Sequence, residues 1–307
     1  MIYIDFIKDK KELLKEEEKE YIKLIKKILI YFRKIFNYIT INKTEYGDIL
    51  KIQNLKSGTY KKIEKIFKIN NVQIVCLSEK LNNNKEFEKF LNNNKVRKVN
   101  GKWLNGYLLL ELIEYIAKNK EEKSFHQEVS FLINKNNYLM SENIYKISKQ
   151  CKNVNIITDK VNQFKSLENK IYEEEGVSIN IGNNYKKSLL NSNIIINVDF
   201  SEEQINKYNI PKYSSIININ DYIKINKKSF EGINIYSVRY IINKEFDEEF
   251  KNFDNNLMYE SLISRNSNHE NVFKQMKKDC LKIVEVYGKN GIIGKKEFLK
   301  LKRIYIN

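Results

Sequence analysis

The chain has 307 residues, of which 42% are hydrophobic and 31% are charged. This length and apolar content allow one large domain or two ordinary domains with packed cores, which excludes a globally disordered protein. A run of about 18 uncharged apolar residues is absent, so we expect no membrane-spanning helix. The opening sequence MIYIDFIKDKKELLKEEEKE lacks the order of basic, apolar and small-residue segments that marks a secretory signal, so we expect a cytoplasmic protein.

The formal net charge is +16, from 55 lysines and arginines against 39 aspartates and glutamates. A basic balance of this size suggests a nucleic-acid partner. The chain is also rich in Lys, Asn and Ile, with one proline and ten glycines, which is the bias of AT-rich codons. Codon bias therefore accounts for much of the lysine. A nucleic-acid or anionic-membrane surface through residues 20–68 is retained only as an alternative function.

The cysteines and histidines do not form a pattern of metal ligands. Cys76, Cys151 and Cys280 are far apart and odd in number, which favours reduced thiols. His126 and His269 are isolated, so we expect no metal site and assign neither of them a catalytic role.

The N-terminal region reads as strands and helices around one long amphipathic segment. Residues 2–6 suggest a short strand, and residues 10–38 have a broad apolar stripe with flanking lysines. That stripe indicates a helix packed on a domain or, alternatively, a helix lying on anionic lipid. A basic helix over residues 59–68, a strand at Val72–Leu77 and an apolar helix at Leu104–Lys118 follow.

The centre of the chain alternates short Val- and Ile-rich runs with segments of helical spacing. These runs lack in/out alternation, which is typical of strands covered on both faces of a parallel sheet. We therefore predict an α/β fold, namely a Rossmann-like, doubly wound and mostly parallel sheet with a smaller N-terminal α/β lobe and a helical C-terminus. The predicted strands are Val129–Ile133, Val154–Thr158, Val177–Ile181, Ile194–Val198 and Ser215–Ile219.

The last part of the chain is predicted to be mainly helical after two strand-like runs, Tyr222–Ile225 and Gly232–Ile241. Asn271–Tyr287 has helical spacing and is followed by Gly288, a common helix-ending residue. The loop GKNGIIG is glycine-rich, but it follows a predicted helix and not a strand, so we interpret it as a turn and not as a phosphate loop.

Three domains follow from these patterns. Residues 1–120 form the N-terminal α/β lobe, and residues 121–255 form the Rossmann-like domain. Residues 256–307 form a helical segment that packs back on the lobe.

Three passages of the central segment carry a family resemblance. VNIITDK, at residues 154–160, ends in a short polar triplet, and SLLNSNIIINVDF and NIPKYSSIININ follow at residues 188–200 and 209–220. This layout resembles the Rossmann-type NAD(P)-binding domain of shikimate dehydrogenases and glutamyl-tRNA reductases. The resemblance implies that Asp159 faces the adenosine ribose of NAD. An aspartate at a strand end is also a common helix cap, so both roles stay open.

The first turn of the predicted sheet departs from the family. The family places glycines there, so that the backbone can approach the pyrophosphate. This chain has NKNNYLMSEN at residues 134–143, with no glycine. The lysine and aspartate that shikimate dehydrogenases use for proton transfer have no counterpart in residues 1–120, so the catalytic residues are unknown. We interpret the domain as a Rossmann-like sheet that has lost the usual glycine-rich turn for binding the cofactor.

Candidate binding residues lie at the carboxyl ends of the predicted strands, where open α/β sheets hold ligands. Asn183 and Asn184 with Lys186 and Lys187, near a predicted helix start, suggest a phosphate site or, alternatively, a plain surface turn. The candidates for cofactor binding are Asn134, Asn136, Asp159, Asn183, Lys186 and Asp199.

Three functions are compatible with these patterns. The first is a non-catalytic sensor, scaffold or partner-binding protein with a degenerate NAD(P)-type domain. The second is an NAD(P)-dependent oxidoreductase with an atypical cofactor loop, and the third is the basic binding protein described above. The missing glycines favour the first, and NAD remains the cofactor to test.

Overall fold

The structure is a computed structural model that describes residues 1–6, 39–265 and 268–302. The helix expected over residues 10–38 lies outside these residues, as does part of the basic surface expected over residues 20–68. In the described part of the chain, no helix is long and apolar enough to cross a membrane. The chain divides into two units, each made of two segments. The first unit is Met1–Asn100 with Lys244–Ser267, and the second is Gly101–Asn243 with Asn268–Asn307.

The first unit contains a five-stranded sheet in the order β2-β3-β1-β4-β5, in which only the β2–β3 pair is antiparallel. Neighbouring residues of β1 point to opposite faces, as strand geometry requires. Ile4 packs in one core cluster, and Tyr3 packs in another with Met258. The strands are β1 Ile2–Phe6, β2 Thr40–Thr44, β3 Gly47–Ile52, β4 Ile74–Leu77 and β5 Arg97–Lys98.

Helices cover both faces of this sheet. Phe67 and Phe87 from α2 and α4 pack in the cluster with Ile4, while Phe250 and Met258 pack in the cluster with Tyr3. The helical elements are α2 Ser57–Ile69, α3 Glu79–Asn82, α4 Lys85–Asn93, α9 Asn255–Ile263 and the 3₁₀ turn η5 Glu248–Phe250.

The second unit contains a six-stranded sheet in which every pair of neighbouring strands is parallel. Its order is β11-β10-β9-β6-β7-β8. When β6 is numbered as the first strand and the sheet is read from β8 to β11, the order is 3-2-1-4-5-6, which is that of doubly wound dinucleotide-binding sheets. The predicted α/β, Rossmann-like fold is therefore confirmed. The strands are β6 Glu128–Leu132, β7 Asn153–Ile157, β8 Asn180–Gly182, β9 Ile194–Asn197, β10 Ser215–Asn218 and β11 Ile233–Ile235.

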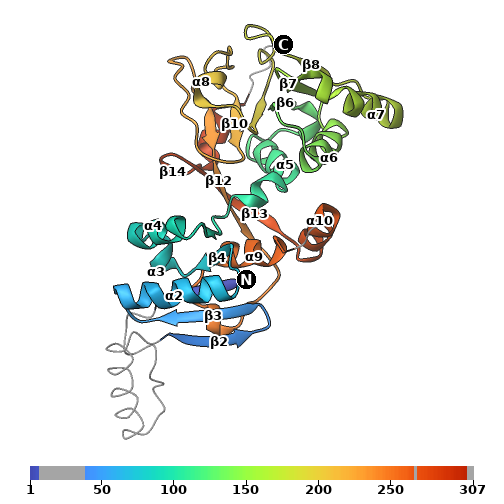
Figure 1. The fold of residues 1–307 in the computed structure, drawn as a ribbon. Helices are drawn as coiled ribbons and strands as arrows, with labels where there is room; N and C mark the ends of the chain where they lie inside the picture. Colours follow the sequence, from blue (N-terminus) through green and yellow to red (C-terminus); the bar gives the residue numbers. More distant parts are fainter. Residues whose placement is uncertain (7–38, 266–267, 303–307) are drawn as a thin grey trace, which may run out of the picture. The chain divides into compact units, whose positions relative to one another are not determined.

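Both faces of the six-stranded sheet are covered, which explains why its strands lack in/out alternation. Figure 1 shows α6, Tyr138–Ser148, and α7, Lys165–Glu175, beside β6, β7 and β8, with α8, Glu202–Ile205, beside β10. One core cluster joins Ile195 and Ile216 of the strands to Ile205 of α8 and to residues of the connecting loops.

A three-stranded antiparallel sheet, β12-β13-β14, completes the second unit with further helices. These elements are β12 Ser237–Ile241, β13 Lys282–Gly288, β14 Gly291–Ile292, α5 Leu109–Asn119, α10 His269–Lys278, α11 Lys295–Leu299 and the 3₁₀ turns η2 Trp103–Gly106, η3 Ser124–His126 and η4 Val161–Gln163.

The helix predicted over Asn271–Tyr287 is wrong beyond its first half. Helix α10 ends at Lys278, Cys280 follows with a φ of 51°, and the chain then enters β13. β-branched and aromatic residues favour a strand there, and β12 supplies the partner backbone, which is a long-range pairing that local spacing does not reveal. Gly288 accordingly ends a strand and does not cap a helix.

The strand predicted over Tyr222–Ile225 is also wrong, because these residues form a loop. Side-chain amides satisfy the backbone of this loop in place of a neighbouring strand: Asn234 donates to the carbonyl of Ile223, and Asn206 donates to that of Lys224.

The compact units divide the chain differently from the expected domains. Helix α5 lies in the second unit, although it was expected in the N-terminal lobe. Of the C-terminal segment, α9 packs on the first sheet, whereas α10, β13, β14 and α11 belong to the second unit. The reason is that the chain crosses between the units three times, after Asn100, Asn243 and Ser267.

Ile195 should be a sensitive position for stability, because it is fully buried in β9 between β6 and β10. We expect Ile195→Ala to lower the free energy of unfolding by about 2–5 kcal/mol. Urea denaturation measures this loss, with Leu190→Ala as the control, since Leu190 is 54% exposed. A loss below about 0.5 kcal/mol for Ile195→Ala would contradict its central position.

Candidate functional site

The turn between β6 and α6 donates its backbone N–H groups to a carboxylate of the same chain. The N–H of Asn134 lies 2.8 Å from one oxygen of Asp199, and the N–H of Lys135 lies 2.7 Å from the other. β6 and β9 are parallel neighbours, so their carboxyl ends lie at the same edge of the sheet. In dinucleotide-binding sheets the corresponding turn faces the pyrophosphate. In this protein the Asp199 carboxylate accepts hydrogen bonds from both N–H groups.

The glycine-free turn is possible because its backbone stays in ordinary conformations. None of its residues has a positive φ, so the turn has no position that requires glycine. Asn137 caps α6 by accepting a hydrogen bond from the N–H of Met140 at 2.9 Å, and Asn136 accepts one from the hydroxyl of Ser141 at 2.9 Å. Amide side chains therefore start the helix at the position where dinucleotide-binding domains have glycines.

The hydrogen bonds continue from this turn to the end of β7. The side-chain oxygen of Asn134 accepts from the N–H of Asp159 at 2.9 Å and from the hydroxyl of buried Thr158 at 3.3 Å. Asn134 therefore holds β7 through its side chain and Asp199 through its backbone.

Asp159 continues the network to the end of β8. Its carboxylate accepts a hydrogen bond from Asn183, whose own side-chain oxygen accepts from the hydroxyl of Tyr208. Burial raises the pKa of the Tyr208 hydroxyl to about 12, so this group remains a donor at neutral pH. We call this set the edge network: Asn134, Thr158, Asp159, Asn183, Asp199 and Tyr208, with the N–H of Lys135.

Four of the six residues proposed from sequence therefore meet at one edge, namely Asn134, Asp159, Asn183 and Asp199. Asn136 lies beside them but bonds within its own turn. Sequence reasoning missed Tyr208, because nothing in the local pattern places it next to Asn183, 25 residues away in the chain.

Lys186 does not take the position expected of it. Residues 185–191 form turns, so the helix start proposed next to Lys186 and Lys187 is absent. Their backbone N–H groups donate to the side chain of Asn184 at 3.0 and 3.1 Å. The segment therefore closes on itself as a surface turn, which was the alternative interpretation.

A second row of amides joins the next strands at the same edge. Asn197 of β9 donates to Asn218 of β10 at 3.2 Å, and Asn218 donates to Asn234 of β11 at 2.5 Å. Asn197 and Asn218 are buried, so these bonds replace water that the amides have lost. The edge is thus tied together from β8 to β11 by the chain's own polar groups.

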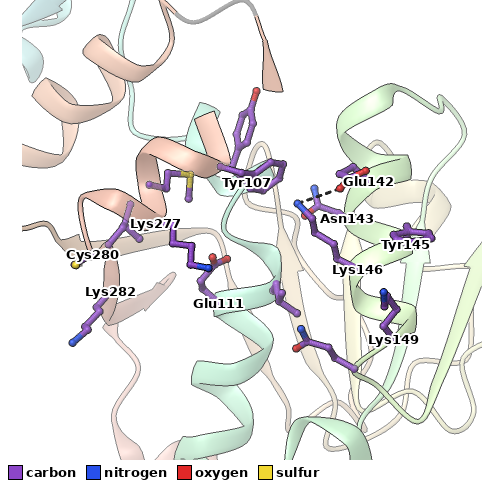
Figure 2. A pocket seen from close by; sticks show the side chains of 15 residues that line it. Tyr107, Glu111, Glu142, Asn143, Tyr145, Lys146, Lys149, Lys277, Cys280 and Lys282 are labelled. Atoms are coloured by element: carbon purple, nitrogen blue, oxygen red, sulfur yellow. Dashed lines mark ion pairs between the residues drawn. The ribbon is translucent and has the colours of Figure 1, made fainter. Parts of the chain in front are cut away.

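A pocket with a volume of about 920 Å³ lies in the second unit, and none of its lining residues belongs to the edge network. Residues of α5, α6, α10 and the start of β13 line it. Figure 2 shows Lys277 on α10 and Lys146 on α6 entering from opposite walls, with Glu111 of α5 between them.

An aromatic group adjoins this pocket. The hydroxyl of Tyr107 lies 2.5 Å from Nδ1 of His269, and the ring of Tyr138 stacks on the same imidazole with centroids 5.5 Å apart. Burial raises the pKa of Tyr107 to about 12. His126 lies in η3, and no group of three or more His, Cys, Asp or Glu residues in the described part of the chain could hold a metal ion.

Comparisons with known proteins leave the family open. No family model matches the chain, and no curated protein sequence matches it significantly. Among solved structures, L-tryptophan dehydrogenase from Nostoc punctiforme is similar at 8% identity, with 91% of this chain and 87% of that chain covered and a TM-score of 0.33. Ornithine carbamoyltransferase from Pyrococcus furiosus is similar at 10% identity, with 90% and 83% covered and a TM-score of 0.30. Similarity at this level establishes no shared function, and the fold assignment rests on the strand order itself.

Removing the Asp199 carboxylate should destabilise the second unit, because two backbone donors would lose charge-assisted hydrogen bonds. We expect Asp199→Ala to lower the free energy of unfolding by about 1–3 kcal/mol in urea denaturation. Asp221→Ala is the matched control, since Asp221 pairs with Lys102 while its side chain is 88% exposed. Equal losses from the two variants, both below about 1 kcal/mol, would show that the Asp199 contact is not stabilising.

Proposed function

We propose that this protein is a non-catalytic sensor, scaffold or partner-binding protein, built on a Rossmann-like domain whose dinucleotide site is filled by its own side chains. The observation that carries the proposal is the Asp199 carboxylate on the N–H groups of Asn134 and Lys135. These two donors belong to the turn that would otherwise face a pyrophosphate.

A dinucleotide in the usual extended pose would have to break this contact. Its phosphates would need the two N–H groups, and the displaced Asp199 carboxylate would then lie close to charges of the same sign. Like charges within a few ångströms repel strongly where water is partly excluded. Binding would therefore cost both the hydrogen bonds and the repulsion.

The ribose position is also engaged. In the usual pose an adenosine ribose would lie beside Asp159, which lines a pocket of about 390 Å³, but the Asp159 carboxylate already accepts a hydrogen bond from Asn183. Both side chains are exposed, so their contact would yield more readily than the one at Asp199. The pyrophosphate position is consequently the stronger barrier.

The composition of the edge network supports a structural role rather than proton transfer. Its side chains are amides, carboxylates and hydroxyls, each engaged with another member of the network. General acid–base catalysis needs a group whose pKa lies near the working pH. The raised pKa of Tyr208 moves that hydroxyl further from neutrality.

Titration of NAD and of NADP by calorimetry tests the proposal. We expect no binding at about millimolar nucleotide, which corresponds to a binding free energy weaker than about −4 kcal/mol. Micromolar NAD binding that is lost in Asp159→Ala would instead favour an NAD-dependent oxidoreductase. Asp221→Ala, an acidic residue of the same unit outside the edge network, serves as the control.

A second experiment tests whether the N–H groups of Asn134 and Lys135 bind an external anion once the Asp199 carboxylate is removed. Inorganic phosphate should raise the melting temperature of Asp199→Ala by mass action, because the variant frees two N–H donors. The unmodified protein should respond no more than the Asp221→Ala control. An equal response of all three proteins would mean that phosphate acts elsewhere on this basic chain.

A further inference from the structure

We propose that the pocket between α5, α6 and α10 binds an apolar organic monocarboxylate, such as a medium-chain fatty acid. This inference deepens the proposed function, on which it rests, by giving a sensor its ligand. The pocket shares no residue with the edge network, and its volume of about 920 Å³ is that of a small-molecule site.

Apolar side chains form much of the pocket surface. Leu110 of α5, Phe273 and Met276 of α10 and Leu281 after α10 line it, together with the ring of Tyr107. Such a surface gains free energy when it covers an apolar ligand, by about 25 cal/mol per Å² removed from water. The ligand should therefore have a sizeable hydrocarbon or aromatic body.

Lysines outnumber carboxyl groups among the residues that line the pocket, with Lys146, Lys149, Lys277 and Lys282 against Glu111 and Glu142. Lys146 lies 3.3 Å from Glu142 and 3.5 Å from the ring centroid of Phe273, so its ammonium is held at the pocket wall. Lys277 faces it from α10 and makes no ion pair within the part of the chain that the structure describes (Figure 2). An anionic head group would balance this charge.

Glu111 adds a specific polar partner between those walls. Its Oε2 atom is buried and has no hydrogen-bond partner among the described residues, which is costly in a folded protein. Burial also raises the pKa of this carboxyl, which favours its neutral, hydrogen-donating form. A neutral carboxyl can donate to a ligand carboxylate, and this contact would satisfy the unpartnered group.

The signs of the surrounding charges decide between an acid and an amine as ligand. An ammonium group could also bond to Glu111, but it would enter between Lys146 and Lys277. Although Lys146 is paired with Glu142, the lining holds four lysines against two carboxyl groups, so a cation would meet more like charges than a carboxylate would. The pocket therefore fits an anion with an apolar body.

Calorimetry on the full chain tests the ligand class with three probes of equal length: decanoate, decan-1-ol and decylammonium, each kept below its aggregation concentration. We expect decanoate to bind at least about tenfold more tightly than either of the others. Tighter binding of decylammonium, equal binding of decanoate and decan-1-ol, or no binding of decanoate would each overturn the proposal.

Substitutions on α10 and α5 locate the site. Lys277→Glu should weaken decanoate binding by about tenfold or more, because it reverses a charge that faces the pocket. Lys274→Glu is the control. Lys274 lies on the same helix, pairs with Glu270 at the surface and does not line the pocket, so this variant should bind decanoate as tightly as the unmodified protein. Equal weakening by the two variants would mean a nonspecific charge effect and would overturn the proposal.

Two further variants separate recognition from folding. Glu111→Gln keeps the size of the side chain and a hydrogen donor, so decanoate binding should persist. Leu110→Trp should narrow the apolar part of the pocket and weaken decanoate binding, while its melting temperature confirms that it is folded. Decanoate binding that is unchanged in both Leu110→Trp and Lys277→Glu would place the ligand elsewhere and reject this site. The NAD titration probes the sheet edge and decanoate probes the pocket, so the two proposals fail separately.

Discussion

The carboxyl edge of the central sheet depends on one contact, the Asp199 carboxylate on the backbone of the β6–α6 turn. It joins the ends of β6 and β9, where the strand order reverses and where open α/β sheets usually hold a ligand. A carboxylate offers the charge and the acceptor atoms that a phosphate would bring. The hydrogen-bonding groups of the turn are therefore satisfied without any bound molecule, and the fold by itself does not establish an activity.

Asparagine side chains form most of the other hydrogen bonds at that edge. An amide both donates and accepts, so a row of asparagines can bridge several strands without adding charge. The pairs from Asn197 through Asn218 to Asn234 do this on one side of β6, and Asn134 and Asn183 do it on the other. The abundance of asparagine looks uninformative in the sequence, but in the structure several asparagines form the hydrogen bonds along this edge. The pocket near Glu111 differs from this edge, because a buried oxygen of Glu111 has no hydrogen-bond partner among the described residues and the lining is partly apolar and partly lysine.

Several predictions from sequence failed for a common reason, which is that the deciding partner lies far away in the chain. Helical spacing continued past Lys278, but the pairing of β13 with β12 turned the next residues into a strand. Similarly, α5 looked like the end of an N-terminal lobe, yet its contacts with α6, β13 and α11 place it in the second unit. Local periodicity reports which side of a segment is apolar, and it does not report which neighbour covers that side.

The sequence by itself determined the central fold, because short runs of Val and Ile without alternation, separated by segments of helical spacing, are typical of strands that are covered on both faces. It also located the important edge, since strand ends and missing glycines can be read directly, and Asn134, Asp159, Asn183 and Asp199 were identified in this way. Only the tertiary structure decided what these residues do to one another. The bond from Asp199 to Asn134 spans 65 positions in the chain, and such a contact exists only after parallel pairing has aligned the two strand ends.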